Sequence, residues 1–164
     1  MEFSLWKSIL LLVAIVAFLL LLITDKLSNF ILITTYGYTR VKVNVGIEGY
    51  LGKLRLYNGC KGIEMNILQE QAYSIARGLK KVNSFRPNAH DLFVQTLKNF
   101  GIKVVMVKID RLKEGVYYAR LILSDGIRLV SLDSRPSDAI AIATRINAPI
   151  YVKNEFLKNI CTNH

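Results

Sequence analysis

The stretch LYNGCKGIEMNILQEQAYSIARGLK, residues 56–80, changes from a strand pattern to a helix pattern. It opens on Asn58-Gly59, a dipeptide typical of a tight β-hairpin. Three apolar residues then alternate with polar ones, as in a half-buried strand: Ile63, Met65 and Ile67. Four further residues recur at helical spacing: Ala72, Ile75, Ala76 and Leu79. The stretch therefore predicts a hairpin followed directly by a helix from Gln69 to about Lys81.

Strand and helix patterns continue on both sides of this stretch. We expect two strands before it and three more after it: 41–45, 51–57, 103–110, 116–123 and 127–133. Asn88 with Asp91 predicts the capped start of a second helix, and Pro136 opens a third. A short strand at 148–152 precedes a short terminal helix capped by Asn154. The chain is therefore predicted to be α+β, with mostly antiparallel strands in two groups and about three main helices.

The N-terminus predicts one transmembrane helix ahead of this fold. Seventeen residues from Ser8 to Thr24 carry no charge, and with Leu5 and Trp6 the run reaches about 20 residues, enough to cross a bilayer. A cleaved secretory signal is the alternative, but its apolar region is usually shorter, and no small-residue cleavage site precedes Asp25. We expect a membrane anchor at 1–25 that crosses with residues 5–24, a linker at 26–40 and a domain at 41–160.

Positive charge near the anchor predicts its orientation. Lys7 precedes the apolar run, whereas Lys26, Arg40 and Lys42 follow it. Because positive residues gather on the cytoplasmic side, the chain is expected to be a single-pass protein of the cell membrane with its domain in the cytoplasm. Cys60 and Cys161 match no metal-binding spacing. They could form one disulfide, but free thiols are expected in a cytoplasmic domain.

The formal charge of +10 narrows the classes of partner. Such an excess attracts nucleic acid, anionic lipid headgroups or an acidic protein, and charge alone does not separate the three.

Two segments place Arg and Asp beside a proline at a helix start: 86–92 and 132–140. A helix N-terminus with a flanking arginine is a natural phosphate site, which gives Arg86 and Arg135 this role. His90 could transfer a proton near neutral pH. Three carboxylates could bind a divalent metal such as Mg²⁺ or Mn²⁺, or activate water: Asp91, Asp133 and Asp138.

The same residues also fit a purely structural role. An Asp in the first turn stabilises a helix without any ligand, and an Arg beside an Asp most often forms an ion pair. Composition and spacing alone favour this structural role. The sequence has no Gly-rich phosphate loop, no zinc-type Cys/His pattern and no Ser nucleophile elbow.

Several separated motifs resemble those of the bifunctional nuclease (BFN) domain family, in the same order. They are the segments 86–92, 101–104, 115–121, 133–141 and 148–152, within a resemblance that covers roughly 41–157. The resemblance implies an α+β domain that often self-associates, hence a homo-oligomer, with nuclease activity on RNA and DNA. The matching polar residues, Ser137 among them as a phosphate contact, are Arg86, His90, Asp91, Asp133, Arg135, Ser137 and Asp138.

One position departs from the family pattern. Where the family usually has an Ile-Gly-x-x-Glu-Ala run, this chain reads Ile67-Leu68-Gln69-Glu70-Gln71-Ala72. If that glutamate takes part in the chemistry, the resemblance implies weakened or lost activity here. The favoured hypothesis is a membrane-tethered nuclease, and the alternative is a non-catalytic basic module that binds nucleic acid, anionic lipid or a protein.

Overall fold

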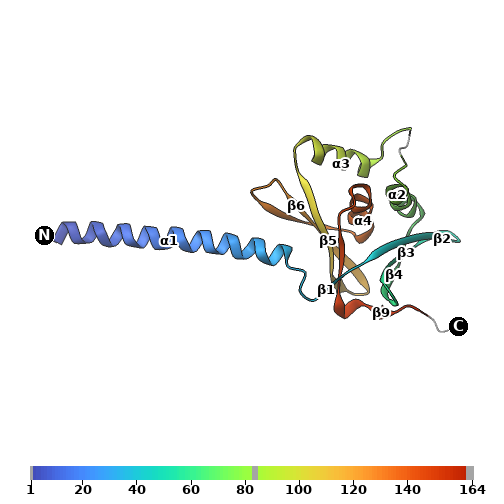
Figure 1. Cartoon of the computed structure of the whole chain (residues 1–164), viewed down its shortest axis with the longest axis horizontal. Helices are drawn as coiled ribbons and strands as arrows, with labels where there is room; N and C mark the ends of the chain where they lie inside the picture. Colours follow the sequence, from blue (N-terminus) through green and yellow to red (C-terminus); the bar gives the residue numbers. More distant parts are fainter. Residues whose placement is uncertain (1, 83–84, 162–164) are drawn as a thin grey trace. The chain divides into compact units, whose positions relative to one another are not determined.

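The structure, a computed structural model, describes residues 2–82 and 85–161. The chain divides into two compact units, residues 1–34 and residues 35–164. The first unit is the helix α1 (Glu2–Ile33), shown in Figure 1. Its segment Ile9–Ile33 has a mean hydropathy of 2.6 and no buried residue, so it is long and apolar enough to cross a membrane. Because α1 continues to Ile33 and strand β1 begins at Tyr38, most of the stretch 26–40 is regular structure instead of linker.

The second unit contains two β-sheets. The five-stranded sheet has the order β1 (Tyr38–Arg40), β8 (Ile150–Lys153), β5 (Lys103–Lys113), β6 (Val116–Ser124), β7 (Leu129–Ser134). The four-stranded sheet has the order β2 (Lys42–Glu48), β3 (Leu51–Asn58), β4 (Lys61–Leu68), β9 (Lys158–Asn159). Neighbouring strands are antiparallel, except that β5 and β8 are parallel. This confirms the predicted α+β class with mostly antiparallel strands in two groups.

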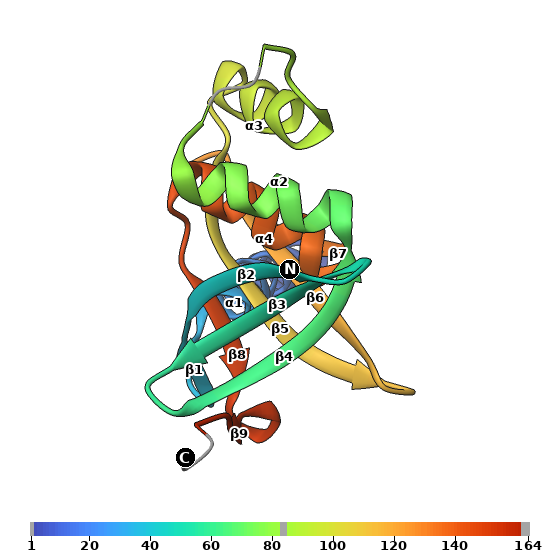
Figure 2. The same cartoon turned by 90° about the vertical axis from the view of Figure 1, so that its right-hand side faces the viewer.

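Three helices complete the domain: α2 (Gln69–Lys80), α3 (Ala89–Asn99) and α4 (Pro136–Ile146). Figure 2 shows them together on one side of the domain, with the strands on the other. Helix α2 packs on β2 and β3, α4 packs on β5 and β6, and α2 and α4 also pack on each other. The short terminal helix is the 3₁₀ turn η1 (Asn154–Phe156). Its N-cap is Lys153, so the cap predicted at Asn154 is wrong by one residue.

Helix α4 lies in the middle of the hydrophobic core. All residues from Ala139 to Ala143 are buried, and they share one apolar cluster with both sheets. Leu54 and Leu56 contribute from β3, while Val107 and Ile109 contribute from β5. Because α4 is fixed along this length, the polar residues at its start, Arg135 and Asp138, are held at a defined place.

Gly78 lets α2 and α4 approach closely. A Cβ atom at this position would lie 2.3 Å from Thr144 Oγ1 and 3.0 Å from Thr144 Cβ. The Thr144 side chain is buried, and its hydroxyl donates to the carbonyl of Ala141 at 3.0 Å, so it has little freedom to move away. The absence of a side chain at Gly78 therefore sets the spacing between these two helices.

Cys60 and Cys161 form a disulfide, with their Cα atoms 5.0 Å apart. The expectation of free thiols is therefore wrong. Strand β9 pairs with β4 at Lys61 and Gly62, and this pairing brings Cys161 to the β3–β4 turn that contains Cys60. The two cysteines are 101 residues apart in sequence, so no local pattern reveals the bond.

We predict that Gly78→Ala lowers the melting temperature of the protein. The added methyl group overlaps Thr144, which has little freedom to move, so the cost of overpacking is expected near the upper end of about 1–3 kcal/mol. This is more than the roughly 1 kcal/mol that alanine gains over glycine in a helix. Gly46→Ala is the matched control, because nothing lies within 4 Å of a Cβ there. Equal melting temperatures of the two variants in thermal unfolding would contradict this account of the α2–α4 contact.

Candidate active site

The N-terminus of α3 is closed by reciprocal hydrogen bonds between Asn88 and Asp91. The Asp91 backbone N–H donates to Asn88 Oδ1 at 3.0 Å, and the Asn88 backbone N–H donates to Asp91 Oδ2 at 2.9 Å. This is the capping box predicted from the sequence. It fixes the first turn of α3 and so directs the side chains of the neighbouring residues His90 and Asp91.

Asp91 also joins three helices through two arginines. Arg145 of α4 donates from Nε to Asp91 Oδ1 at 2.6 Å, and Arg77 of α2 donates from Nη2 to Asp91 Oδ2 at 2.9 Å. Burial raises the pKa of the Asp91 carboxyl, but the Asn88 N–H, Arg145 and Arg77 outweigh it and hold this pKa below its usual value. Both Asp91 oxygens are thus engaged in hydrogen bonds, which is typical of a structural carboxylate.

Arg145 is the centre of this network, and only 8% of its side chain is exposed. Besides Asp91 it donates to the Ser74 and Ala141 carbonyls, to the Ser74 hydroxyl and to Asn88 Oδ1. Sequence reasoning missed both Arg145 and Ser74. Arg145 is the one charged residue in the otherwise mostly apolar C-terminal half of α4, and this position could have indicated a buried ion pair.

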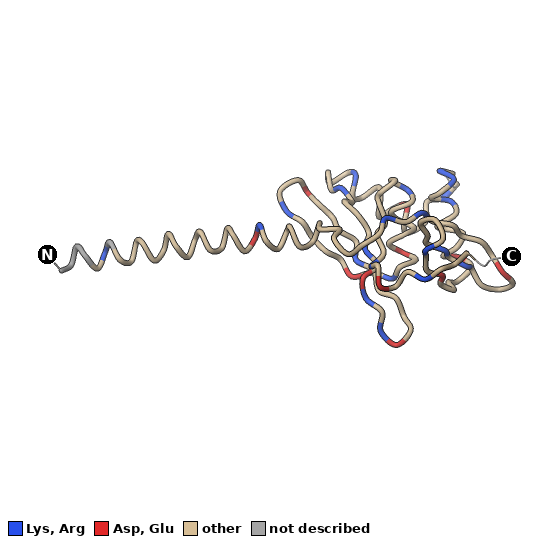
Figure 3. Tube along the Cα trace, turned by 60° about the horizontal axis from the view of Figure 1, so that its bottom comes forward, with Lys and Arg blue, Asp and Glu red and all other residues tan. Residues whose placement is uncertain are grey.

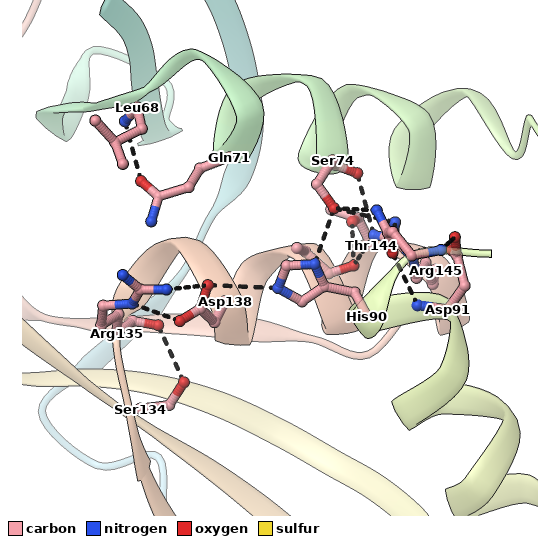
Figure 4. Close-up of polar contacts among 12 residues, drawn as sticks. Leu68, Gln71, Ser74, His90, Asp91, Ser134, Arg135, Asp138, Thr144 and Arg145 are labelled. Carbon is pink, nitrogen blue, oxygen red and sulfur yellow. Dashed lines mark hydrogen bonds and ion pairs between the residues drawn. The ribbon is translucent and has the colours of Figure 1, made fainter. Parts of the chain in front are cut away.

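His90 is held between Ser74 and Asp138. Its Nδ1 lies 3.0 Å from Ser74 Oγ, and its Nε2 lies 3.4 Å from Asp138 Oδ1, as Figure 4 shows. The Ser74 hydroxyl already accepts from Asn88 Nδ2 at 3.2 Å and from Arg145 Nη2 at 3.1 Å. Both of its lone pairs are therefore used, and its proton points to His90 Nδ1. This assigns the neutral tautomer of His90, with its proton on Nε2 and directed at Asp138.

Asp138 connects this network to solvent through Arg135. Arg135 donates from Nε to Asp138 Oδ2 at 2.7 Å and from Nη2 to Asp138 Oδ1 at 3.3 Å. Its side chain is 70% exposed, so the guanidinium is open to a ligand. Ser74, His90, Asp138 and Arg135 thus form one chain of hydrogen bonds from the buried face of α2 to the surface at the start of α4 (Figure 4).

The other three residues expected at the site differ in their surroundings. Asp133, on β7, pairs with Arg111 at 3.2 Å, and both side chains are exposed. Ser137 is buried in α4, where a phosphate does not reach it. Arg86 is exposed in the segment before α3. The structure brings together His90, Asp138 and Arg135, with Asp91 as the structural neighbour of His90.

The three carboxylates expected to share a metal ion do not form a metal site. Within residues 2–82 and 85–161, no three His, Cys, Asp or Glu side chains are placed to hold one ion. Asp91 is engaged by two arginines, Asp133 by Arg111 and Asp138 by Arg135. The donors present therefore do not fit a protein-held Mg²⁺ or Mn²⁺.

Gln71 stands where the family pattern has a glutamate. Its Oε1 accepts the Leu68 backbone N–H at 3.0 Å and so caps the start of α2. In Figure 4 its side chain extends from α2 towards the Arg135–Asp138 pair of α4. Gln71, the residue that departs from the family pattern, therefore lies on the side of α2 that faces the candidate site.

A model of the family described as the bifunctional nuclease domain matches residues 54–163. An uncharacterised protein of Mycobacterium tuberculosis is 38% identical over 104 residues, which are 63% of this chain and 62% of that protein. Bifunctional nuclease 2 of Arabidopsis thaliana is 32% identical over 94 residues, 56% of this chain and 28% of that protein. Bifunctional nuclease 1 of Oryza sativa subsp. japonica is 28% identical over 96 residues, which are 57% of this chain and 29% of that protein. The chain thus spans less than two thirds of the length of these relatives.

We predict that Asp91→Asn destabilises the protein by about 2 kcal/mol at pH 7, because Arg77 and Arg145 lose the charge of their shared partner. The folded-state pKa of Asp91 is lowered, so its contribution is complete above the unfolded-state pKa of about 4 and is lost as the pH falls through the lower folded-state value.

Thermal unfolding between pH 7 and pH 3 tests this prediction. The gap in melting temperature between wild type and Asp91→Asn should be largest at pH 7 and should close in acid. Asp133→Asn is the control, since its exposed pair with Arg111 should contribute less than about 1 kcal/mol. An equal fall in melting temperature in Asp91→Asn and Asp133→Asn would refute the central role of Asp91.

Proposed function

The chain belongs to the bifunctional nuclease domain family, and from this premise we propose that it hydrolyses phosphodiester bonds of RNA or DNA while α1 tethers it to a membrane. The observation that supports catalysis is the chain of hydrogen bonds from Ser74 through His90 and Asp138 to the exposed Arg135. It holds the Asp138 carboxylate, through the His90 N–H, beside the exposed Arg135 guanidinium, where a phosphodiester and its attacking water could meet both.

In the proposed reaction each group has one role. Arg135 binds the non-bridging phosphate oxygens, to which its planar fork is suited. Asp138 accepts a proton from water, and the water oxygen bonds to phosphorus as the ester P–O bond breaks. His90, with its proton on Nε2, donates a hydrogen bond to Asp138 and so orients the carboxylate towards the water. The leaving oxygen takes its proton from solvent.

The network around Ser74 refines the part expected for His90. A protonated His90 would have to donate from Nδ1 to the Ser74 hydroxyl, whose two lone pairs already accept from Asn88 and Arg145. The network therefore favours the neutral ring, which acts here as a hydrogen-bond donor instead of the proton shuttle expected from the sequence.

The positive charge of the domain supports a nucleic-acid substrate. Lysine and arginine are spread over the domain, whereas most of α1 carries no charge, as Figure 3 shows. A surface with an excess of ten positive charges attracts a polyanion independently of its base sequence. Self-association, implied by the family resemblance, remains a prediction.

A non-catalytic binding module is the second candidate, and a specific observation favours it. Each of the three aspartates proposed for chemistry is paired with at least one arginine, as expected if these residues serve only to stabilise the fold. Gln71 replaces the family glutamate at the same time. In this case the basic surface would bind nucleic acid, anionic lipid or a protein partner without turnover.

We predict that the full chain in detergent cleaves end-labelled single-stranded RNA or DNA, and that Asp138→Asn lowers the rate on the order of 100-fold or more. His90→Gln should also lose activity, whereas Asp133→Asn should stay within about twofold of wild type. Each protein is assayed with Mg²⁺, with Mn²⁺ and with a chelator.

Two results would count against the proposed site or against catalysis. Full activity in a folded Asp138→Asn variant would remove the site. Binding of the oligonucleotides without cleavage under any condition would favour the module, and Gln71→Glu would then be the next variant.

A further inference from the structure

A cleft lies next to the Asp91–Arg145 network, and both of these residues line it. It has a volume of about 370 Å³ and is formed where the C-terminal half of α2, α3 and the end of α4 meet. Its charged lining consists of Arg77, Lys81, Asp91, Lys98 and Arg145. His90, Asp138 and Arg135 do not line it, so it is separate from the candidate active site.

The lining of this cleft has an excess of positive charge. Four cations face one carboxylate, which leaves three positive charges in excess. Asp91 is already shared between Arg77 and Arg145. Among residues 2–82 and 85–161, neither Lys81 nor Lys98 has an ion pair with a carboxylate.

Lys81 is positioned by the end of α2 and by α4. Lys81 is fixed in a left-handed backbone conformation at the end of α2, and its Nζ donates to the Thr144 carbonyl at 2.5 Å. Burial, and then the charge of Lys98, lower the pKa of Lys81. Arg77 Nε is buried without a hydrogen-bond partner in the part of the chain that the structure describes. An anion in the cleft would relieve the repulsion between the two lysines.

We propose that this cleft binds a phosphate group that carries about two negative charges. A terminal phosphate monoester carries about −1.5 to −2 at neutral pH, whereas a diester in a nucleic-acid backbone carries only one, so the excess of three cations suits the monoester better. Lysine and arginine are the side chains that bind phosphate most often. The cleft is within the size range of small-molecule sites.

The ligand is inorganic phosphate, a free mononucleotide or the phosphorylated end of an oligonucleotide, all of which share this chemistry. Phe85 is fully exposed and lies two residues before Pro87, which lines the cleft. An exposed aromatic ring is available to stack on a base. The proposal is independent of the proposed nuclease activity, because it concerns binding in a different cleft.

Calorimetric titration of the full chain in detergent, carrying Asp138→Asn so that the trinucleotides are not cleaved, tests the proposal. The probes are inorganic phosphate, AMP, adenosine, dimethyl phosphate and one trinucleotide with and without a 5′-phosphate. We expect the monoesters or inorganic phosphate to bind, and adenosine, dimethyl phosphate and the 5′-hydroxyl trinucleotide to bind at least tenfold more weakly. Tightest binding of inorganic phosphate identifies the free ion as the ligand, whereas tighter binding of AMP or of the phosphorylated trinucleotide identifies a nucleotide.

Three variants locate the binding. Lys98→Gln and Gln95→Glu change the charge of the cleft on the surface of α3, and each should weaken phosphate binding about fivefold or more. Lys113→Gln removes the same charge at the exposed β5–β6 turn and should leave binding unchanged. Equal weakening in Lys98→Gln and Lys113→Gln, or no binding of any monoester, would overturn the proposal. Neither result bears on nuclease activity, since no turnover is measured.

The disulfide carries a second, independent inference about the side of the membrane on which the domain lies. The C-terminal segment that bears Cys161 is docked in place: Ile160 donates its N–H to the Cys60 carbonyl at 2.8 Å. Gly62 makes room for this segment, because a Cβ there would lie 2.7 Å from Ile160 Cδ1. The fold therefore positions the two thiols for a stable bond.

We infer that the domain lies on the oxidising, non-cytoplasmic side of the membrane. Disulfides form and persist in oxidising compartments and are rare where cellular thiol systems keep cysteines reduced. The lysine count that favoured the cytoplasm is nearly even beside the apolar run, with Lys7 before it and Lys26 after it. The disulfide is the stronger of the two observations.

Thiol trapping in cells that express the full chain tests the orientation. Cells are quenched in acid, denatured and treated with a mass-tagged maleimide, with and without prior reduction. We expect modification of both cysteines only after reduction, and one modification without reduction in the Cys60→Ser control. A membrane-impermeant lysine reagent should also label the domain in intact cells. Unreduced wild-type protein that reacts at both cysteines, or a domain protected from the lysine reagent, would overturn the inference.

Discussion

The Asp91 carboxylate, shared between Arg77 and Arg145, is the interaction on which the helical side of this domain depends. It joins α2, α3 and α4 at one point, and the Asn88 cap fixes it from within α3. Arg145 is almost fully buried, so its charge needs this partner and the carbonyls that it reaches. The same arginine donates to Ser74, so the position of His90 follows from the same network.

His90 and Asp91, neighbours at the start of α3, therefore have different roles. Asp91 is enclosed by cations and holds the helices together, whereas His90 reaches towards Asp138 and the solvent-exposed Arg135. Two surfaces result next to the Arg145 network. The first presents a carboxylate with an imidazole N–H, and the second is a cleft in which cations outnumber carboxylates. This separation is consistent with chemistry at one surface and phosphate binding at the other.

The pairing of acids with arginines affects both candidate functions. A carboxylate that is fully engaged in ion pairs is a poor base, but Asp138 differs from Asp91 because its arginine partner is exposed and free to bind a substrate phosphate instead. A phosphodiester that draws Arg135 away would leave Asp138 next to His90, with an oxygen available to accept a proton. Gln71, on α2, extends towards Arg135 and Asp138 (Figure 4). It is neutral, whereas the family pattern has a negatively charged glutamate at this position.

Most helices and strands of this protein follow from local sequence signals. The change of period after Leu68, the Asn88–Asp91 cap and the proline at the start of α4 each predict a helix, because these signals act within a few residues. The uncharged N-terminal run likewise predicts α1. Which polar residues meet depends on the packing of these elements. His90 and Asp138 are 48 residues apart and Cys60 and Cys161 are 101 apart, whereas Asp133, five residues before Asp138, pairs with Arg111 instead. These contacts depend on how α2, α3 and α4 pack and on the pairing of β4 with β9, and no local spacing in the chain encodes either.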